Sequence, residues 1–208
     1  MNQKNSLGLD KSFLDLDDPF ELFEKWFDEA KNKEINDPNA LALATASKTG
    51  IPSVRIVLLK GFDKNGFVFY TNLNSQKGNE LKDNPNATMC FHWKSLLRQI
   101  RIVGSLKLVD DKTADDYYKT RAYESRIGAW ASKQSSILKS RDELLNSMEN
   151  FKNKYNDRDK VPRPDHWSGW NLKPSSIEFW LDGDNRIHER LRYTLDADSN
   201  WVKNLLSP

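Results

Sequence analysis

Cysteine is nearly absent from this sequence of 208 residues, which contains a single one, Cys90. One cysteine excludes a disulfide scaffold and any cysteine-based zinc cluster. The three histidines show no metal-ligand spacing; they are His92, His166 and His188. We therefore expect no metal site and a reduced, cytoplasmic setting.

Long apolar runs and an excess of one charge are missing as well. No stretch approaches the length of a transmembrane helix, and the polar start MNQKNSLGLDKSF lacks the apolar core of a signal peptide. Lys and Arg number 32 against 30 Asp and Glu, which gives a formal net charge of +2. A nucleic-acid-binding protein usually shows a stronger basic excess. We expect neither a nucleic-acid nor a membrane partner, and any anion site must be local.

The order of periodic segments and turns predicts an α+β fold, mainly antiparallel β, in the form of a small barrel with peripheral helices. Strands are expected at 40–47, 53–62, 67–72, 86–93, 98–109, 175–181, 186–195 and 201–206. Helices are expected at 17–34, 75–84, 111–132 with a break near Gly128, and 135–156, with a loop at 157–171. Residues 1–17 are weakly periodic and predict a mobile arm, and residues 18–208 predict one domain.

The standard nucleotide-binding and hydrolase motifs are not found. The sequence contains no G-x-G-x-x-G after a strand, no Walker lysine loop, no G-x-S-x-G and no H-E-x-x-H. Cations scattered among amide, hydroxyl and aromatic side chains remain as the candidates for chemistry.

Two of these cations lie in the segment SVRIVLLK. Arg55 and Lys60 are an odd number of residues apart, so on one regular strand they face opposite sides and can serve two different anions. The alternative is a pair of charges at the edge of a barrel surface. Ser75, Gln76 and Lys77 open the next expected helix, where free N–H groups favour a phosphate. An ordinary serine cap explains the same residues.

Three further groups show the same ambiguity. Tyr117, Arg121 and Ser125 are spaced four apart, so they share one face of a continuous helix and can grip a phosphate, or form a solvated face. Gln134 and Ser135 stand at an expected helix start, as ligand groups or as caps. If the segment NRIHER forms a strand, Arg186, His188 and Arg190 lie on one face of it. That face is either exposed to solvent or in contact with an anionic ligand.

The order and spacing of several short segments resemble the pyridoxine (pyridoxamine) 5′-phosphate oxidase family. These segments are RIVLLK, FYTN, S-x-K, RQ, IGAWASKQSS, IEFW and RIHER, and the resemblance runs from about Pro38 to the end. IGAWASKQSS and EFW…R-x-H-x-R are its most specific parts. The resemblance implies an FMN-binding split β-barrel that works as a homodimer, with FMN at the subunit interface.

The resemblance also implies roles for individual residues. The positions that match the FMN site are Arg55, Ile56, Val57, Leu58, Leu59, Lys60, Tyr70, Thr71, Gln76, Lys77, Gln99, Gln134, Ser135, Trp180 and Arg190. Of these, Trp180 and Arg190 are expected from the partner subunit. The positions that match the substrate site are Lys60, Tyr117, Arg121, Ser125, Arg186, Ile187 and His188. Arg186 and His188 are the expected catalytic residues, so RIHER would form a wall between substrate and flavin.

The implied reaction is hydride transfer from C4′ of pyridoxamine or pyridoxine 5′-phosphate to flavin N5. It yields pyridoxal 5′-phosphate, and O2 reoxidises the flavin to give hydrogen peroxide. Two positions depart from the family pattern. Gln76 stands where the family often has arginine, which weakens FMN binding by about 1 kcal/mol. The arm GLDKSFLDLDD lacks an arginine-rich segment and offers only Lys11, so it is left out of the site.

Three other functions remain open from the sequence. The chain can be another split-barrel flavin oxidoreductase, although the substrate-phosphate residues argue against it. It can be a non-catalytic protein that binds flavin or pyridoxal phosphate. It can also be a barrel with solvent-exposed basic faces and no ligand.

Overall fold

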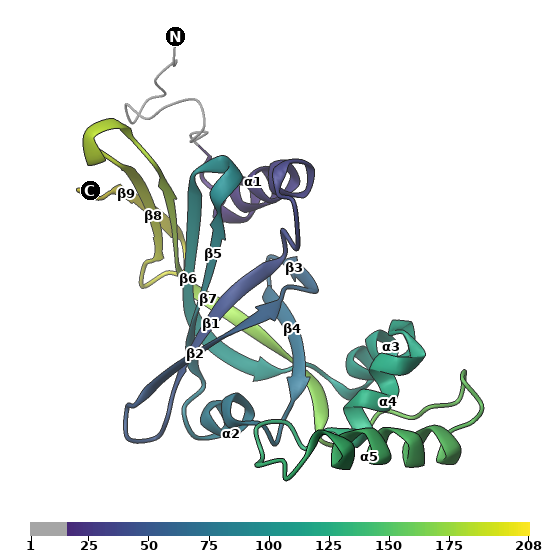
Figure 1. Cartoon of the computed structure of the whole chain (residues 1–208). Helices are drawn as coiled ribbons and strands as arrows, with labels where there is room; N and C mark the ends of the chain where they lie inside the picture. Colours follow the sequence, from purple (N-terminus) through teal and green to yellow (C-terminus); the bar gives the residue numbers. More distant parts are fainter. Residues whose placement is uncertain (1–15) are drawn as a thin grey trace.

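A single antiparallel sheet organises the computed structural model, which describes residues 16–208 (Figure 1). The strand order is β2-β1-β5-β6-β7-β4-β3, and β8 and β9 extend the sheet beside β7. The strands are β1 (Ala40–Ala46), β2 (Pro52–Leu58), β3 (Gly61–Asp63), β4 (Gly66–Asn72), β5 (Asn86–Trp93), β6 (Arg98–Leu108), β7 (Trp167–Leu181), β8 (Glu189–Leu195) and β9 (Trp201–Leu205). The helices are α1 (Pro19–Lys33), α2 (Gln76–Asp83), α3 (Asp111–Thr120), α4 (Tyr123–Ala131) and α5 (Arg141–Lys154).

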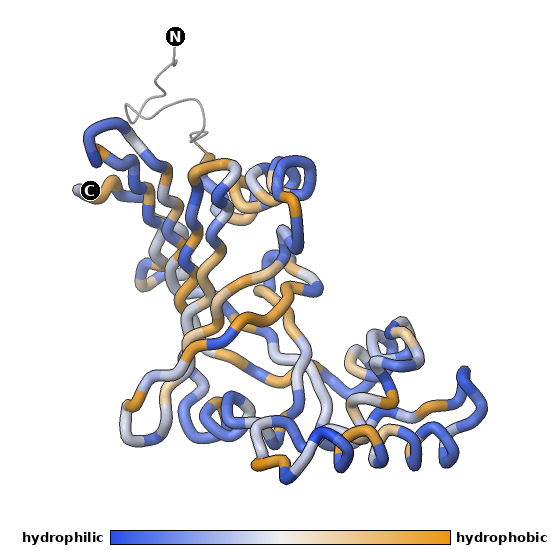
Figure 2. Tube along the Cα trace, in the orientation of Figure 1, coloured by the Kyte–Doolittle hydropathy of each residue, from blue (hydrophilic) through white to orange (hydrophobic). Residues whose placement is uncertain are grey.

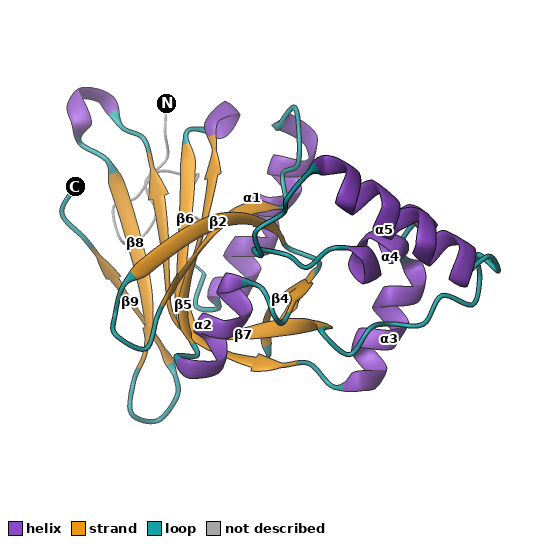
Figure 3. Ribbon diagram, turned by 60° about the horizontal axis from the view of Figure 1, so that its bottom comes forward, coloured by secondary structure: helices purple, strands orange, loops and turns teal. Residues whose placement is uncertain are grey.

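The long strand β7 splits the sheet into two arms. Its first half, from Trp167 to Leu172, pairs with β4, and its second half, from Ser176 to Leu181, pairs with β8. The β4 arm curls back toward β2, whereas β8 and β9 project away from it (Figures 1 and 3). This curl creates a half-barrel with one apolar interior (Figure 2).

Helix α1 closes one end of the half-barrel. Asp18 caps it, Pro19 occupies its first position, and its apolar side chains are buried, so the helix expected at 17–34 is confirmed. The Phe23 ring packs edge-on against Phe67 and Phe91, with centroids 4.9 and 5.4 Å apart. Figure 2 shows apolar residues concentrated along the strands that surround this interior.

The strands and the hairpin predicted in the N-terminal half are confirmed, with one exception. Asp63 pairs with Gly66 across the expected turn, and α2 starts after Ser75 as predicted. The expected continuous strand 53–62 is wrong, because β2 ends at Leu58 and β3 starts at Gly61. Leu59 is buried in the core at this break. The expectation that Arg55 and Lys60 face opposite sides of one regular strand therefore does not apply.

The helical region also differs from expectation. The break lies at Arg121 and Ala122, between α3 and α4, and not near Gly128, which lies inside α4. Tyr118 Oη donates to the Arg126 carbonyl at 2.9 Å and holds the two helices together. The expected helix start at Gln134 and Ser135 is wrong, because residues 132–140 form a loop and Ser140 caps α5.

The strand predicted at 186–195 begins only at Glu189. Asn185 and Arg186 have φ angles of 56° and 64° and form a short turn. Asparagine adopts this left-handed conformation more readily than most residues. Arg186 therefore does not share a regular strand face with His188 and Arg190, and that prediction is wrong. Strand β7 begins at Trp167, inside the expected loop, because residues 167–172 pair with β4.

The predicted mobile arm lies mostly outside the described residues, and so does Lys11. Its last two residues are described. The Leu16 carbonyl accepts a hydrogen bond of 2.7 Å from Tyr193 Oη, and the Asp17 carboxylate lies 2.8 Å from Lys203 Nζ. Among residues 16–208, no helix has the length and apolar character needed to cross a membrane.

Gly78 fixes where α2 lies, and we expect Gly78→Ala to destabilise the fold. A Cβ at this position would lie 2.3 Å from the Leu73 carbonyl oxygen. The backbone must shift, at a cost of about 1–3 kcal/mol in the free energy of unfolding. Gly128→Ala is the matched control, because a Cβ there meets nothing within 4 Å. Urea unfolding should show a loss only for Gly78→Ala; equal stability of the two variants would contradict the expectation.

Candidate functional site

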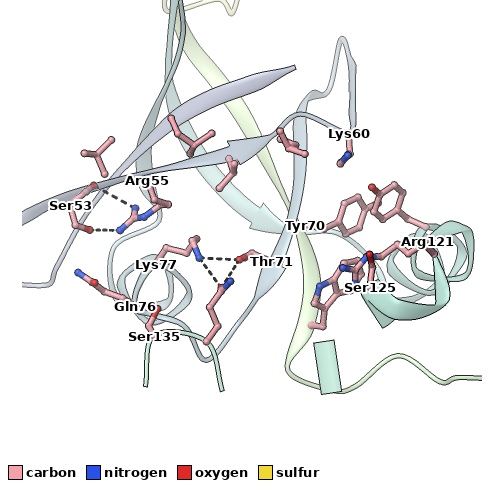
Figure 4. A pocket seen from close by; sticks show the side chains of 18 residues that line it. Ser53, Arg55, Lys60, Tyr70, Thr71, Gln76, Lys77, Arg121, Ser125 and Ser135 are labelled. Carbon is pink, nitrogen blue, oxygen red and sulfur yellow. Dashed lines mark hydrogen bonds between the residues drawn. The ribbon is translucent and has the colours of Figure 1, made fainter. Parts of the chain in front are cut away.

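A pocket of about 740 Å³ lies between β2, β4, α2 and the helical region (Figure 4). Its lining residues are Ser53, Val54, Arg55, Ile56, Val57, Leu58, Lys60, Tyr70, Thr71, Gln76, Lys77, Tyr117, Arg121, Ala122, Ser125, Gln134, Ser135 and Trp167. Four of these side chains are Lys or Arg, and none is Asp or Glu. The pocket is therefore built for an anion.

Lys77 is the most buried cation of the pocket, with 8% of its surface exposed. Its Nζ donates to Gln134 Oε1 at 2.9 Å and to the hydroxyls of Thr71 and Ser75 at 3.2 Å each (Figure 4). Burial lowers the pKa of Lys77, and the neighbouring Arg55 charge lowers it further. Neutral groups alone surround the ammonium at hydrogen-bond distance, so an incoming anion meets little competition for it.

Arg55 lies beside Lys77 and is held from behind by the buried carboxylate of Glu80. Its guanidinium is 3.3 Å from Glu80 Oε2 and also donates to Thr45 and Ser53. Gln76 Nε2 donates to the other carboxylate oxygen at 2.9 Å. Burial raises the pKa of Glu80, but hydrogen bonds from Thr45, Ser53 and Gln76 and the Arg55 charge outweigh it and leave the pKa at about 2.

The depressed pKa of Glu80 predicts a pH-dependent stability. Its carboxylate stabilises the fold fully above the unfolded-state pKa of 4.5, and this contribution is lost as pH falls through the folded-state pKa of about 2. We expect Glu80→Gln to be less stable than the wild type at pH 7, and the difference to shrink between pH 5 and 2. Urea unfolding across this range measures it. A difference that stays constant with pH would contradict the ionised carboxylate as its source.

The opposite side of the pocket carries a second group of cations and aromatic rings (Figure 4). The Tyr70 ring stacks on Tyr117 at 4.0 Å and on Trp167 at 5.2 Å. The Arg121 guanidinium lies over the Trp167 ring at 4.6 Å. Burial lowers the pKa of Arg121, and it also raises the pKa of the Tyr70 hydroxyl, with help from Tyr117 and Asp110.

Two predicted patterns fail locally, yet their residues meet in the pocket. Arg55 and Lys60 lie on separate segments, and Figure 4 shows them on different sides of the same cavity. Tyr117 is on α3, Arg121 follows that helix, and Ser125 is on α4. The turn between the helices, and not one continuous helical face, brings these side chains together.

Seven predicted site residues do not line this pocket. Leu59 is buried in the core. The others are Gln99, Trp180, Arg186, Ile187, His188 and Arg190. They come from β6, β7, β8 and the turn before β8. In Figures 1 and 3, β8 lies across the sheet from α3 and α4.

The pairing register of β6, β7 and β8 brings most of these six residues together in a second cluster. Gln99 pairs with Trp180, which pairs with Arg190, so the three lie in one row across β6, β7 and β8. The His188 ring lies 4.7 Å from the Trp180 ring, and His188 Nδ1 is 2.9 Å from Asp182 Oδ1. The buried Glu178 carboxylate accepts two hydrogen bonds from Arg190, at 2.9 and 3.0 Å. Glu178 also accepts from Arg101.

Four lining residues escaped the sequence reasoning: Ser53, Val54, Ala122 and Trp167. The first two immediately precede Arg55 on β2, and Ala122 follows Arg121, so proximity to assigned residues is the available signal. Trp167 falls in the loop expected at 157–171. Its pairing with Asn72 at the end of β4, which places it in the pocket, has no local signal in the sequence.

The residues present fit FMN. Pockets for small ligands typically enclose about 300–1,000 Å³, and this one offers cations for a phosphate beside rings and aliphatic side chains for a planar group. Residues 16–208 contain no group of three or more His, Cys, Asp or Glu side chains that could hold a metal ion.

The curled antiparallel sheet and the carboxylate-free pocket at its edge define a split β-barrel of the flavin-binding class. PhzG from Burkholderia lata, solved with tetrahydrophenazine-1-carboxylic acid, superposes with a TM-score of 0.88 at 30% identity and covers 93% of this chain and 94% of its own. An FMN-binding protein from Nostoc punctiforme related to pyridoxamine 5′-phosphate oxidase shares the fold, with a TM-score of 0.74 at 18% identity, over 94% of this chain and 100% of its own.

Sequence comparison narrows the class to a family. The family model for pyridoxamine 5′-phosphate oxidase matches residues 27–155, and that for the pyridoxine 5′-phosphate oxidase C-terminal dimerisation region matches residues 167–208. The pyridoxine/pyridoxamine 5′-phosphate oxidase of Pelagibacter ubique is 69% identical over the full length of both chains. That of Allorhizobium ampelinum is 55% identical over 94% of this chain and 95% of its own. The chain belongs to the pyridoxine/pyridoxamine 5′-phosphate oxidase family.

Proposed function

We propose that this protein is an FMN-dependent oxidase that converts pyridoxamine or pyridoxine 5′-phosphate to pyridoxal 5′-phosphate, with O2 as the final acceptor and hydrogen peroxide as the by-product. The observation that carries the proposal is the division of the pocket cations into two groups. Arg55 and Lys77 form one, and Lys60 and Arg121 form the other, with aromatic rings beside the second. Two phosphorylated ligands, cofactor and substrate, require two such groups.

The first group suits the FMN phosphate. Arg55 and Lys77 provide charge, and Gln134 and Ser135 border the same side of the pocket. Gln76 adds a neutral contact. The segment from Arg55 to Lys60, with Tyr70 and Thr71, would line the ribityl chain or the ring. When bound, FMN supplies a two-electron acceptor that O2 regenerates.

The second group suits the substrate phosphate. Lys60, Tyr117, Arg121 and Ser125 all line the pocket, and Figure 4 shows Lys60, Arg121 and Ser125 on the side away from Arg55 and Lys77. A planar guanidinium binds a phosphate through two parallel hydrogen bonds, which orients as well as attracts it. Another split-barrel oxidoreductase with an uncharged substrate would have no use for these cations.

The cluster around β8 completes the site from a partner subunit in this proposal. Gln99, Trp180 and Arg190 would contact the flavin, and Arg186, Ile187 and His188 would cover the substrate ring. The dimerisation-region match over residues 167–208 supports it, because β7, β8 and the turn between them fall in that range. Arg186 is a permanent cation that can hold polar substituents near the reacting carbon, and His188 orients the ring or moves a proton.

An absorbance spectrum tests the function directly. Purified protein should show flavin bands that bleach when pyridoxine 5′-phosphate is added anaerobically and return with air. If the flavin bands persist after the substrate is added, the protein is another flavin oxidoreductase or a non-catalytic flavin carrier. No flavin band after FMN is supplied would overturn the proposal.

We also propose a cytoplasmic location, which the free thiol of Cys90 favours.

A further inference from the structure

Trp167 is the aromatic side chain of the pocket that the proposed function leaves without a role. It is the first residue of β7 and is 6% exposed, yet it lines the cavity. Its ring is parallel to Tyr117, with centroids 6.2 Å apart and an interplanar angle of 2°, and it meets the Tyr118 ring edge-on at 5.0 Å. The indole is therefore locked between two residues of α3 and the Tyr70 ring of β4.

The Arg121 guanidinium stacks on this indole. Among residues 16–208, no carboxylate pairs with the Arg121 guanidinium, and its buried Nη1 has no hydrogen-bond partner. The nearest anchors are two ring faces, Trp167 at 4.6 Å and Tyr118 at 5.6 Å. A long side chain without an ion pair would otherwise sample several rotamers. A guanidinium stacked on an indole face within about 6 Å is restrained and keeps its N–H groups free.

The start of β7 is fixed to α3 by a second arginine. Arg163 Nη1 donates to the Trp167 carbonyl at 2.8 Å. The same guanidinium lies 2.7 Å from Asp111 and 2.6 Å from Asp115, both on α3. Asp111 and Asp115 therefore pair with Arg163, and Arg121, at the end of the same helix, is left with no acid. Arg163 thus links the start of β7, and with it the indole, to α3.

We propose that Trp167 is a positioning residue for recognition of the substrate phosphate, because its indole face holds the unpaired Arg121 guanidinium in the pocket. The inference rests on the proposed function, in which Arg121 binds that phosphate. It predicts that Trp167 governs affinity for phosphorylated ligands on this side of the pocket. FMN binding, which uses Arg55 and Lys77 on the other side, does not depend on it.

The test compares W167L, W167F and the wild type as FMN-loaded proteins. Pyridoxal 5′-phosphate is titrated by calorimetry, because the product binds without turnover. We expect the Kd to rise about tenfold in W167L and about threefold in W167F, which keeps a smaller ring face. The KM for pyridoxine 5′-phosphate should rise in parallel, with kcat within about twofold of wild type, since loss of a binding contact shared by ground and transition states raises KM alone.

Trp170→Leu is the matched control. Trp170 lies on the same strand and is buried in the main core, and it does not line the pocket. This variant should lose stability without a change in the Kd for pyridoxal 5′-phosphate. In W167L, the Kd for FMN, measured by flavin fluorescence, should stay within about twofold of wild type because the Lys77 side of the pocket is untouched.

Three results would overturn the inference while leaving the proposed function intact: W167L binds pyridoxal 5′-phosphate as the wild type does, Trp170→Leu weakens binding equally, or FMN affinity falls together with product affinity. If W167L does not fold, the W167F titration decides in the same way. A wild-type protein that binds FMN but neither binds pyridoxal 5′-phosphate nor oxidises the substrates would instead overturn the proposed function, and the inference with it.

Discussion

Arg55→Ala and Arg190→Ala should each be inactive alone, and their heterodimer should recover half of the wild-type activity per dimer. Arg55 lies in the pocket beside β2, whereas Arg190 belongs to the separate cluster on β8. If one site uses Arg55 of one subunit and Arg190 of the other, the heterodimer has one site with both arginines intact. A randomly assorted equal mixture should therefore recover about a quarter of wild-type turnover.

Co-expression with two different affinity tags isolates the heterodimer for this measurement. The matched control pairs Arg55→Ala with Lys77→Met, which damage the same side of the pocket in both subunits. That heterodimer has no intact site and should stay nearly inactive at FMN concentrations that just saturate the wild type. An isolated Arg55→Ala and Arg190→Ala heterodimer without activity would refute a site shared between subunits.

Lys77→Met and Arg121→Met should separate cofactor binding from substrate binding. Lys77 Nζ is surrounded by neutral acceptors, and the Arg121 guanidinium has no acid partner among residues 16–208. Each cation is thus available to one phosphate. We expect Lys77→Met to raise the Kd for FMN about 100-fold, the loss of a strong charge-assisted contact, and Arg121→Met to raise the KM for pyridoxine 5′-phosphate by a similar factor.

Flavin fluorescence titration and steady-state kinetics at saturating FMN give the two readouts. Lys133→Met is the control for loss of one positive charge, because Lys133 is exposed beside Gln134 and does not line the pocket. It should leave both constants near wild type. If either pocket variant raised both constants equally, the two cation groups would not serve separate phosphates.

Local sequence signals determined the elements that depend on neighbouring residues. The helix expected at 17–34, the turn between the strands expected at 53–62 and 67–72, and the helix start at Ser75 are all confirmed. Each of these involves contacts within a few residues, or one face of one element. Motif order and spacing likewise led to the family and to most of the lining residues.

Geometric arguments that extended one element too far were wrong. One strand is expected from Arg55 to Lys60 and one helix from Tyr117 to Ser125, yet both segments break. The residues still meet, because the curl of the sheet and the turn at Ala122 redirect them into one pocket. Trp167 was missed because its strand exists only through pairing with β4.

The sequence by itself determined the class of protein, the absence of a cysteine framework, and the side chains available to bind two phosphates. Only the tertiary structure decided that Arg55 and Lys77 face Lys60 and Arg121 across one cavity, and that the β8 cluster lies apart from it. The physical reason is range. Caps, turns and periodicity act over a few residues, whereas strand pairing joins residues as distant as Asn72 and Trp167, and no local pattern encodes which partner a strand will choose.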